Sequence, residues 1–152
     1  MAIRRTKLER IGIVTGTLGS DCHVTGTRLL EHAFRGAGFR VTGLGAMNPQ
    51  EAFIKAAVET DASAILVSSL YGHANMDCIG FRQRCEEAGL KGILLYIGGN
   101  LAVGDEQVWS RTEKEFRELG FDRVFPPETT PKMAIAALEK DLAATTKRQK
   151  GD

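Results

Sequence analysis

The sequence predicts an α/β protein built on one parallel sheet with helices on both faces. Short apolar runs alternate with amphipathic segments from one end of the 152-residue chain to the other. One of these runs, AILVS at residues 64–68, is continuously apolar, as expected of a central strand that is covered on both sides. Because strand–helix–strand crossovers are right-handed, five such units in a row place helices on both faces of a parallel sheet.

The first two units occupy the N-terminal part of the chain. Residues 11–15 (IGIVT) are expected to form a strand, and apolar residues at helical spacing predict a helix over residues 25–37. Gly38 is placed to end that helix. A second strand over residues 39–44 leads to Pro49, which a first helical turn tolerates, and to a helix that ends near residue 60.

Three further units complete the chain. Their strands are expected at residues 64–68, 92–97 and 123–125, and their helices at residues 76–88, 106–119 and 131–144. At this length the natural strand order is 2-1-3-4-5, the flavodoxin-like (Rossmann-like), doubly wound arrangement. One domain is expected over residues 9–144, between an N-terminal tail (1–8) and a disordered C-terminal tail (145–152).

Composition narrows the functional class. The chain is 43% hydrophobic and 26% charged, and its 20 basic and 19 acidic residues leave a net charge of +1, which predicts no attraction to nucleic acid. No apolar run approaches the roughly 20 residues that cross a membrane, and the start of the chain lacks an apolar signal core. We therefore expect a cytoplasmic protein.

The three cysteines support neither a disulfide framework nor a zinc knuckle, because their number is odd and no Cys-x-x-Cys occurs. Cys78 and Cys85 lie seven positions apart, on one face of the helix expected over residues 76–88. We interpret them as small buried hydrophobic residues of a protein from a reducing compartment.

Three loops follow the first, third and fourth strands and emerge at the same edge of the predicted sheet. They are GTLGSDCHVTG (16–26), SSLYGHANM (68–76) and GGNLAVG (98–104), the joints of the chain richest in glycine and polar residues. Ligands of such sheets bind outside the carboxyl ends of the strands, near the point where the strand order reverses. A ligand site is therefore expected at these loops.

Three familiar kinds of site match the loops poorly. A flavin-binding T-x-T-G-x-T loop requires glycine where Leu18 stands, so a flavin site is only weakly supported. A phospho-acceptor receiver domain requires aspartate at the end of the third strand, which ends instead in two serines. A hydrolase could combine a serine or Cys22 with His23 or His73, but adjacent residues such as Cys22 and His23 usually point apart, and nothing in the sequence marks an oriented nucleophile–base–acid set.

The first loop contains Asp21-x-His23-x-x-Gly26, which fits a metal ligand and its supporting carboxylate. A neutral histidine binds a metal through one ring nitrogen while a carboxylate holds the other N–H. One histidine suffices when a macrocycle supplies most of the coordination, as in haem or cobalamin, and glycine lets the backbone pass close to a bulky ligand. The alternative is that His23 caps a helix that starts near Thr25, and this loop alone slightly favours that alternative.

The other two loops favour a ligand. Ser68-x-Leu70 ends the third predicted strand, and Gly98-Gly99 ends the fourth. A hydroxyl and a glycine pair that face one crevice suit a flat heterocycle between sheet and helix. Each has an ordinary explanation, a strand-end hydrogen bond for Ser68 and a tight turn for the glycines, but the three loops together point to one ligand.

These residues resemble a known signature. Asp-x-His-x-x-Gly, Ser-x-Leu and Gly-Gly are similar to the pattern shared by the cobalamin-binding domains of cobalamin-dependent mutases and methionine synthase. GSDCH, GAGF, SSLYG, EEAGLKGI, GGN and GFDRVFPP more closely resemble the small subunit (S or sigma component) of glutamate mutase, also called methylaspartate mutase, over about residues 9–142. The chain departs from this family at residues 73–75, where His-Ala-Asn replaces the usual Gln-Gly-Glu.

The resemblance implies a cofactor site in which cobalamin binds base-off. His23 would be the lower cobalt ligand, and Asp21 would hydrogen-bond its far nitrogen. The displaced nucleotide tail would lie in a slot beside the sheet, lined by Ser68, Leu70, Gly98 and Gly99. Further contacts are expected from Ser20, Cys22, Val24, Gly26, Ser69, Asn100, Leu101 and Ala102.

The resemblance also implies an activity. Members of this family use adenosylcobalamin, whose Co–C homolysis starts the radical rearrangement of L-glutamate to (2S,3S)-3-methylaspartate. A larger barrel-type subunit binds the substrate, two copies of each chain assemble, and the small subunit is inactive alone. This chain would then contribute no catalytic residue beyond the cobalt ligand. A cobalamin carrier, sensor or methyl-transfer module without mutase activity would share the same three loops and remains the alternative.

Overall fold

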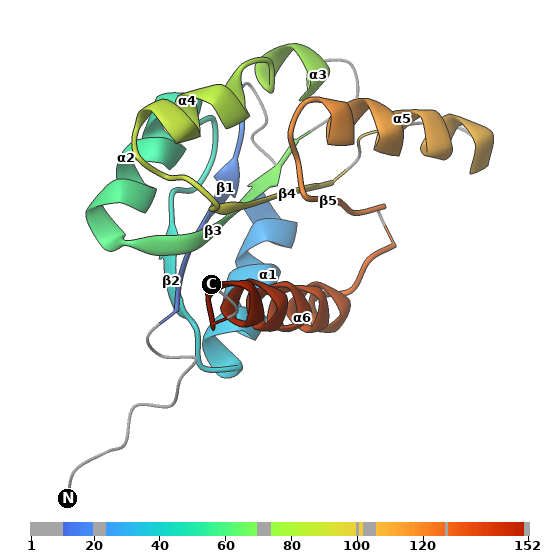
Figure 1. The fold of residues 1–152 in the computed structure, drawn as a ribbon. Helices are drawn as coiled ribbons and strands as arrows, with labels where there is room; N and C mark the ends of the chain where they lie inside the picture. Colours follow the sequence, from blue (N-terminus) through green and yellow to red (C-terminus); the bar gives the residue numbers. More distant parts are fainter. Residues whose placement is uncertain are drawn as a thin grey trace, which may run out of the picture.

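In the computed structural model, five parallel strands within the described residues form one sheet in the order β2-β1-β3-β4-β5 (Figure 1). The structure describes residues 11–19, 24–69, 74–99, 101, 106–126 and 128–150. The strands are β1 (Gly12–Thr17), β2 (Arg40–Gly43), β3 (Ala62–Ser68), β4 (Leu94–Gly98) and β5 (Arg123–Val124). The predicted flavodoxin-like sheet and its strand order are confirmed.

Helices cover both faces of the sheet, as the crossover rule predicts. They are α1 (Val24–Gly36), α2 (Gln50–Thr60), α3 (Ala74–Asp77), α4 (Phe81–Glu87), α5 (Glu106–Glu118) and α6 (Pro131–Lys150). Figure 1 shows α1 and α6 together on one side of the sheet and α2, α4 and α5 on the other. The sheet is thus doubly wound.

Side chains of β3 alternate between two buried cores. Ile65 and Val67 pack in the core under α2, α4 and α5, whereas Ala64 and Leu66 pack in the core under α1 and α6. All four are at most 5% exposed. This alternation with a period of two on a fully covered sheet explains why the strand sequence is continuously apolar.

Two helix predictions were wrong. The helix expected over residues 76–88 is divided into α3 and α4, because Gly80 has φ 78° and a right-handed helix cannot continue through that conformation. The last helix was expected to end at Ala144, but α6 continues to Lys150. Cys78 and Cys85 are fully buried, as predicted, although they lie on either side of the break at Gly80.

None of the described helices is long and apolar enough to cross a lipid bilayer.

Candidate functional site

The ends of β1, β3 and β4 lie next to one another at one edge of the sheet. Thr17 of β1 is in register with Ser68 of β3, and Ser68 is in register with Gly98 of β4. The three predicted loops therefore leave the sheet from adjacent positions. This confirms that the topology gathers them at the carboxyl edge, at the point where the strand order reverses.

Only part of the predicted site lies within the described residues. The predicted site residues that lie outside the described part of the chain are Ser20, Asp21, Cys22, His23, Leu70, Asn100 and Ala102. Val24 and Gly26 lie in the first turn of α1. The predicted cobalt ligand and its carboxylate belong to the stretch that joins the end of β1 to the start of α1, and they stay predictions.

The backbone at Gly99 closes tightly over the end of β3. Gly99 has φ 104°, and a β-carbon there would stand 2.5 Å from the carbonyl oxygen of Ser69 and 3.1 Å from Oγ of Ser68. The amide of Ser69 donates a hydrogen bond of 3.1 Å to the carbonyl of Gly98. The structure thus brings together four of the predicted residues, Ser68, Ser69, Gly98 and Gly99.

A cavity of about 300 Å³ opens beside these residues, on the face of the sheet covered by α1 and α6. Ser68, Gly98 and Gly99 form part of its wall. Leu101, another predicted contact, is 3% exposed and packs in the core on the opposite face. Its predicted contact with a ligand is therefore not supported by this arrangement and stays a prediction.

The position of α1 over the cavity is fixed by a buried hydrogen bond. The hydroxyl of Thr15 in β1 donates to Oε1 of Glu31 in α1 at 2.7 Å. Gly43 in β2 gives this carboxylate room, because a β-carbon at residue 43 would stand 2.6 Å from Oε1 of Glu31. A buried hydrogen bond to a carboxylate is stronger than one between neutral groups. This bond therefore anchors α1, whose first turns border the cavity.

Three buried hydroxyl groups in this part of the fold have no hydrogen-bond partner within the described residues, and two of them belong to residues that line the cavity. They are Oγ1 of Thr27, Oγ1 of Thr129 and Oγ of Ser69. Thr27 and Thr129 line the cavity, and Ser69 lies beneath Gly99. A buried hydroxyl left without a partner costs about 1–3 kcal/mol. Such groups indicate a cavity built to receive polar atoms of a ligand.

Several wall residues were not predicted from the sequence. They include Thr27 and Leu30 of α1, Tyr96 of β4, Phe125 after β5, Thr129, and Ala134 of α6. Two signals could have found some of them. Thr27 is a polar residue on the buried face of an amphipathic helix, and Thr129 follows the fifth strand at the same carboxyl edge as the other loops.

Most of the cavity wall is apolar, and its polar atoms are hydroxyls and backbone groups. Leu30, Leu66 and Phe125 contribute hydrocarbon surface, and the threonines add a few hydrogen-bonding groups. This combination is typical of pockets for flat organic ligands, in which apolar walls bury the ring and a few polar groups orient it.

Comparison with known proteins identifies the family. Residues 11–136 match the B12 binding domain family, which covers most of the sheet and its helices. The chain is 56% identical to the glutamate mutase sigma subunit of Clostridium cochlearium over 135 residues, which cover 89% of this chain and 98% of that protein. It is 55% identical, with the same coverage, to the glutamate mutase sigma subunit of Clostridium tetani.

Among solved structures, a cobalamin-binding protein from Desulfitobacterium hafniense has a TM-score of 0.68 at 20% identity, over 87% of this chain and 59% of that chain. That likeness shows the fold. The match to the domain family and the identity to the two clostridial proteins show more: the chain belongs to the B12-binding domain family and, within it, to the glutamate mutase sigma subunits.

Proposed function

We propose that this chain binds cobalamin base-off, with His23 as the lower cobalt ligand, and presents it to a larger catalytic subunit of a glutamate mutase. The cavity between the sheet, α1 and α6 carries the proposal. It opens at the carboxyl edge of the strands, where β1 ends and α1 begins, and it holds the unpaired hydroxyls of Thr27 and Thr129.

The residues present fit the nucleotide tail of cobalamin. Its flat base requires an apolar slot, which Leu30 and Phe125 provide, and its ring nitrogen and sugar oxygens require hydrogen-bonding groups, which the unpaired threonine hydroxyls and Ser68 provide. Gly98 and Gly99 form part of the cavity wall without side chains, so a ligand can approach the backbone there.

The positions of the proposed cobalt ligand and its supporting carboxylate in the sequence also fit the topology. β1 ends at Thr17 and α1 begins at Val24, so Asp21 and His23 belong to the connection at the carboxyl edge. In the proposed site the carboxylate of Asp21 holds the N–H of the imidazole, which fixes the tautomer and increases the basicity of the coordinating nitrogen. Ser20, Cys22, Leu70, Asn100 and Ala102 are proposed to complete the contacts around the cofactor.

Adenosylcobalamin, when bound, supplies a carbon-centred radical for rearrangement of a carbon skeleton. The residues of this chain bind and orient that group. We place L-glutamate on a larger barrel-type partner, with two copies of each chain in the assembly and activity only in the complex. Two observations support this division: the relatives are named as one subunit of an enzyme, and this chain matches 98% of their length. We expect the assembly in the cytoplasm.

The test of cobalt ligation is electron paramagnetic resonance of cob(II)alamin bound to the purified chain, with unlabelled and nitrogen-15-labelled protein. A change of the nitrogen splitting from a triplet to a doublet on labelling, and its loss in His23→Ala, is the expected result. Splitting that labelling leaves unchanged would show that the cofactor keeps its own base, and the proposed ligation would be wrong.

The test of the reaction is formation of methylaspartate from L-glutamate when the cobalamin-loaded chain is mixed with the large subunit of one of the clostridial relatives. Product that requires both chains is the expected result. Tight cobalamin binding without product, with a large subunit shown to be active with its own small subunit, would favour a carrier or sensor instead.

A further inference from the structure

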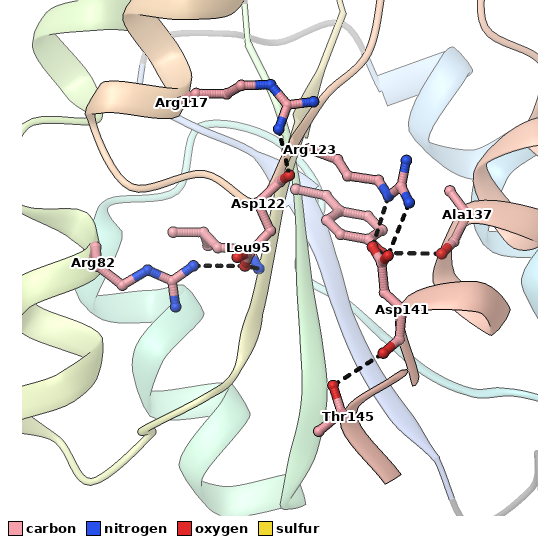
Figure 2. A network of polar contacts seen from close by, with 9 residues as sticks. Arg82, Leu95, Arg117, Asp122, Arg123, Ala137, Asp141 and Thr145 are labelled. Carbon is pink, nitrogen blue, oxygen red and sulfur yellow. Dashed lines mark hydrogen bonds and ion pairs between the residues drawn. The ribbon is translucent and has the colours of Figure 1, made fainter. Parts of the chain in front are cut away.

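One carboxylate joins α6 to β4 and β5 on the face of the sheet that holds the cavity. Asp141 lies on α6, Tyr96 on β4 and Arg123 on β5, and Figure 2 shows the guanidinium of Arg123 facing the carboxylate of Asp141. Tyr96 and Arg123 are paired in register on the neighbouring strands. Side chains of paired residues on parallel strands point to the same face of the sheet, here the face that α6 covers.

The contacts at Asp141 use both carboxylate oxygens. Arg123 donates through Nε to Oδ2 at 2.6 Å and through Nη2 to Oδ1 at 2.8 Å, which is the two-point geometry that favours arginine–carboxylate pairs. The hydroxyl of Tyr96 also donates to Oδ2. A phenol has one proton to donate, and the carbonyl of Ala137, at 3.4 Å, is the weaker acceptor.

Tyr96 connects this network to the cavity. Its side chain is 1% exposed and forms part of the cavity wall, while its hydroxyl is held by Asp141. The ring packs edge-on against Phe125, another wall residue, with 5.5 Å between ring centroids. A displacement of the Tyr96 hydroxyl therefore shifts a side chain that forms the cavity wall.

The same carboxylate fixes α6. Ala134, Leu138 and Asp141 are spaced by four and three residues, so they share the helix face that lies on the sheet. Ala134 is a wall residue, and Leu138 is fully buried beneath it in the core. Arg123 therefore holds α6 at one point, two turns beyond the residues that border the cavity.

Burial and the bond to Asp141 raise the pKa of the Tyr96 hydroxyl, so it stays protonated and remains a donor.

We propose that Asp141 is a positioning residue for the nucleotide slot, which it shapes by holding the Tyr96 hydroxyl and the Arg123 guanidinium at once. The proposal rests on the proposed cobalamin function and deepens it. Loss of this contact frees the Tyr96 ring and the start of α6, and the slot then fits the nucleotide tail less closely. The loss of affinity should be specific to corrinoids that carry the nucleotide tail, because the proposed cobalt ligand, His23, does not belong to the slot that binds the tail.

The experiment compares the affinities of the purified chain for hydroxocobalamin and for diaquocobinamide, which lacks the nucleotide tail, by absorbance titration. Tyr96→Phe removes only the hydroxyl and leaves the ring in the wall, and Asp141→Asn removes the charge. Asp122→Asn is the matched control. Asp122 accepts hydrogen bonds from Arg82 at 2.7 Å and from the amide of Leu95 at 2.8 Å, and it does not line the cavity (Figure 2).

We expect the ratio of cobalamin affinity to cobinamide affinity to fall about fivefold in Tyr96→Phe and about tenfold in Asp141→Asn, the sizes that one or two lost hydrogen bonds produce. The double variant should fall no further than Asp141→Asn, because the two groups act as one unit. In Asp122→Asn the ratio should stay within about twofold of wild type even where thermal unfolding shows lower stability.

An unchanged ratio in Tyr96→Phe and Asp141→Asn overturns the inference, and so does an equal fall in Asp122→Asn, which would indicate general loosening of the fold. A wild-type chain that binds cobinamide but no detectable cobalamin refutes the slot and leaves cobalt ligation standing. A wild-type chain that binds neither refutes the proposed function, and this inference falls with it.

Discussion

Replacing Gly99 by alanine is expected to destabilise the ligand-free protein by about 3 kcal/mol. Two costs contribute. The left-handed backbone, with φ 104°, strains a residue that has a β-carbon by about 1–2 kcal/mol. The added carbon also stands 2.5 Å from the carbonyl oxygen of Ser69, a backbone atom that cannot rotate away, and forced overpacking costs about 1–3 kcal/mol.

Thermal unfolding followed by circular dichroism measures this effect. In a chain of 152 residues each kcal/mol lowers the melting temperature by about 2–4 °C, so Gly99→Ala should melt about 6–12 °C below wild type. Two glycines provide matched controls. Gly89 has φ 87° with open space around it, so Gly89→Ala should show the backbone strain alone, about 1–2 kcal/mol. Gly98 has ordinary contacts only, the nearest at 3.5 Å, so Gly98→Ala should cost less still.

The ranking of the three variants decides the argument. If Gly99→Ala is no less stable than Gly89→Ala, the close approach to Ser69 has no energetic consequence. The tight closure over β3 would then not explain the glycine at this position.

Three further predictions follow from the buried groups. Thr27→Val removes an unpaired buried hydroxyl, so the ligand-free chain should gain up to about 1 kcal/mol in urea unfolding while cobalamin binds more weakly; tighter binding would contradict the role of that hydroxyl. The hydrogen bonds from Arg123 hold the pKa of Asp141 below its ordinary value, so the ionised carboxylate stabilises the folded protein. That contribution to the free energy of unfolding is complete above about pH 4, and it is lost as the pH falls through the lower pKa of the folded state. The stability of Asp141→Asn should therefore depend less on pH below about 4 than that of wild type, and parallel curves would refute the assignment. Burial raises the pKa of Cys85 to about 11 and raises that of Cys78 as well. In a Cys22→Ala chain, Ellman's reagent at pH 8 should therefore react only after denaturant is added, and rapid reaction of the folded chain would show that these thiols are accessible.

The sheet could be predicted because its signals are local. The continuous apolar run of β3, the glycine-rich strand ends and the helical spacing of α1 are each visible within about a dozen residues. The carboxyl-edge rule then located Ser68, Gly98 and Gly99 at one site without knowledge of any contact. The break at Gly80 was missed because a single glycine within an amphipathic pattern is compatible with a helix.

The cavity walls could not be predicted in the same way. Tyr96 and Asp141 are 45 residues apart, and nothing local in either segment indicates that they meet. Their contact exists because β4 and α6 are placed on each other by the whole topology. Thr129 is an intermediate case, because the strand before it, Arg123–Val124, is too short to give a sequence pattern that indicates the loop after it as part of the site.

The cavity walls also come from distant parts of the chain. α1 begins at Val24, and the segment that closes the opposite side, from Phe125 into α6, lies about a hundred residues later. During synthesis on the ribosome, the first wall emerges long before the second. A nascent chain therefore has no enclosed cavity until α6 has been made, and whatever ligand fills it must be taken up after translation of that helix.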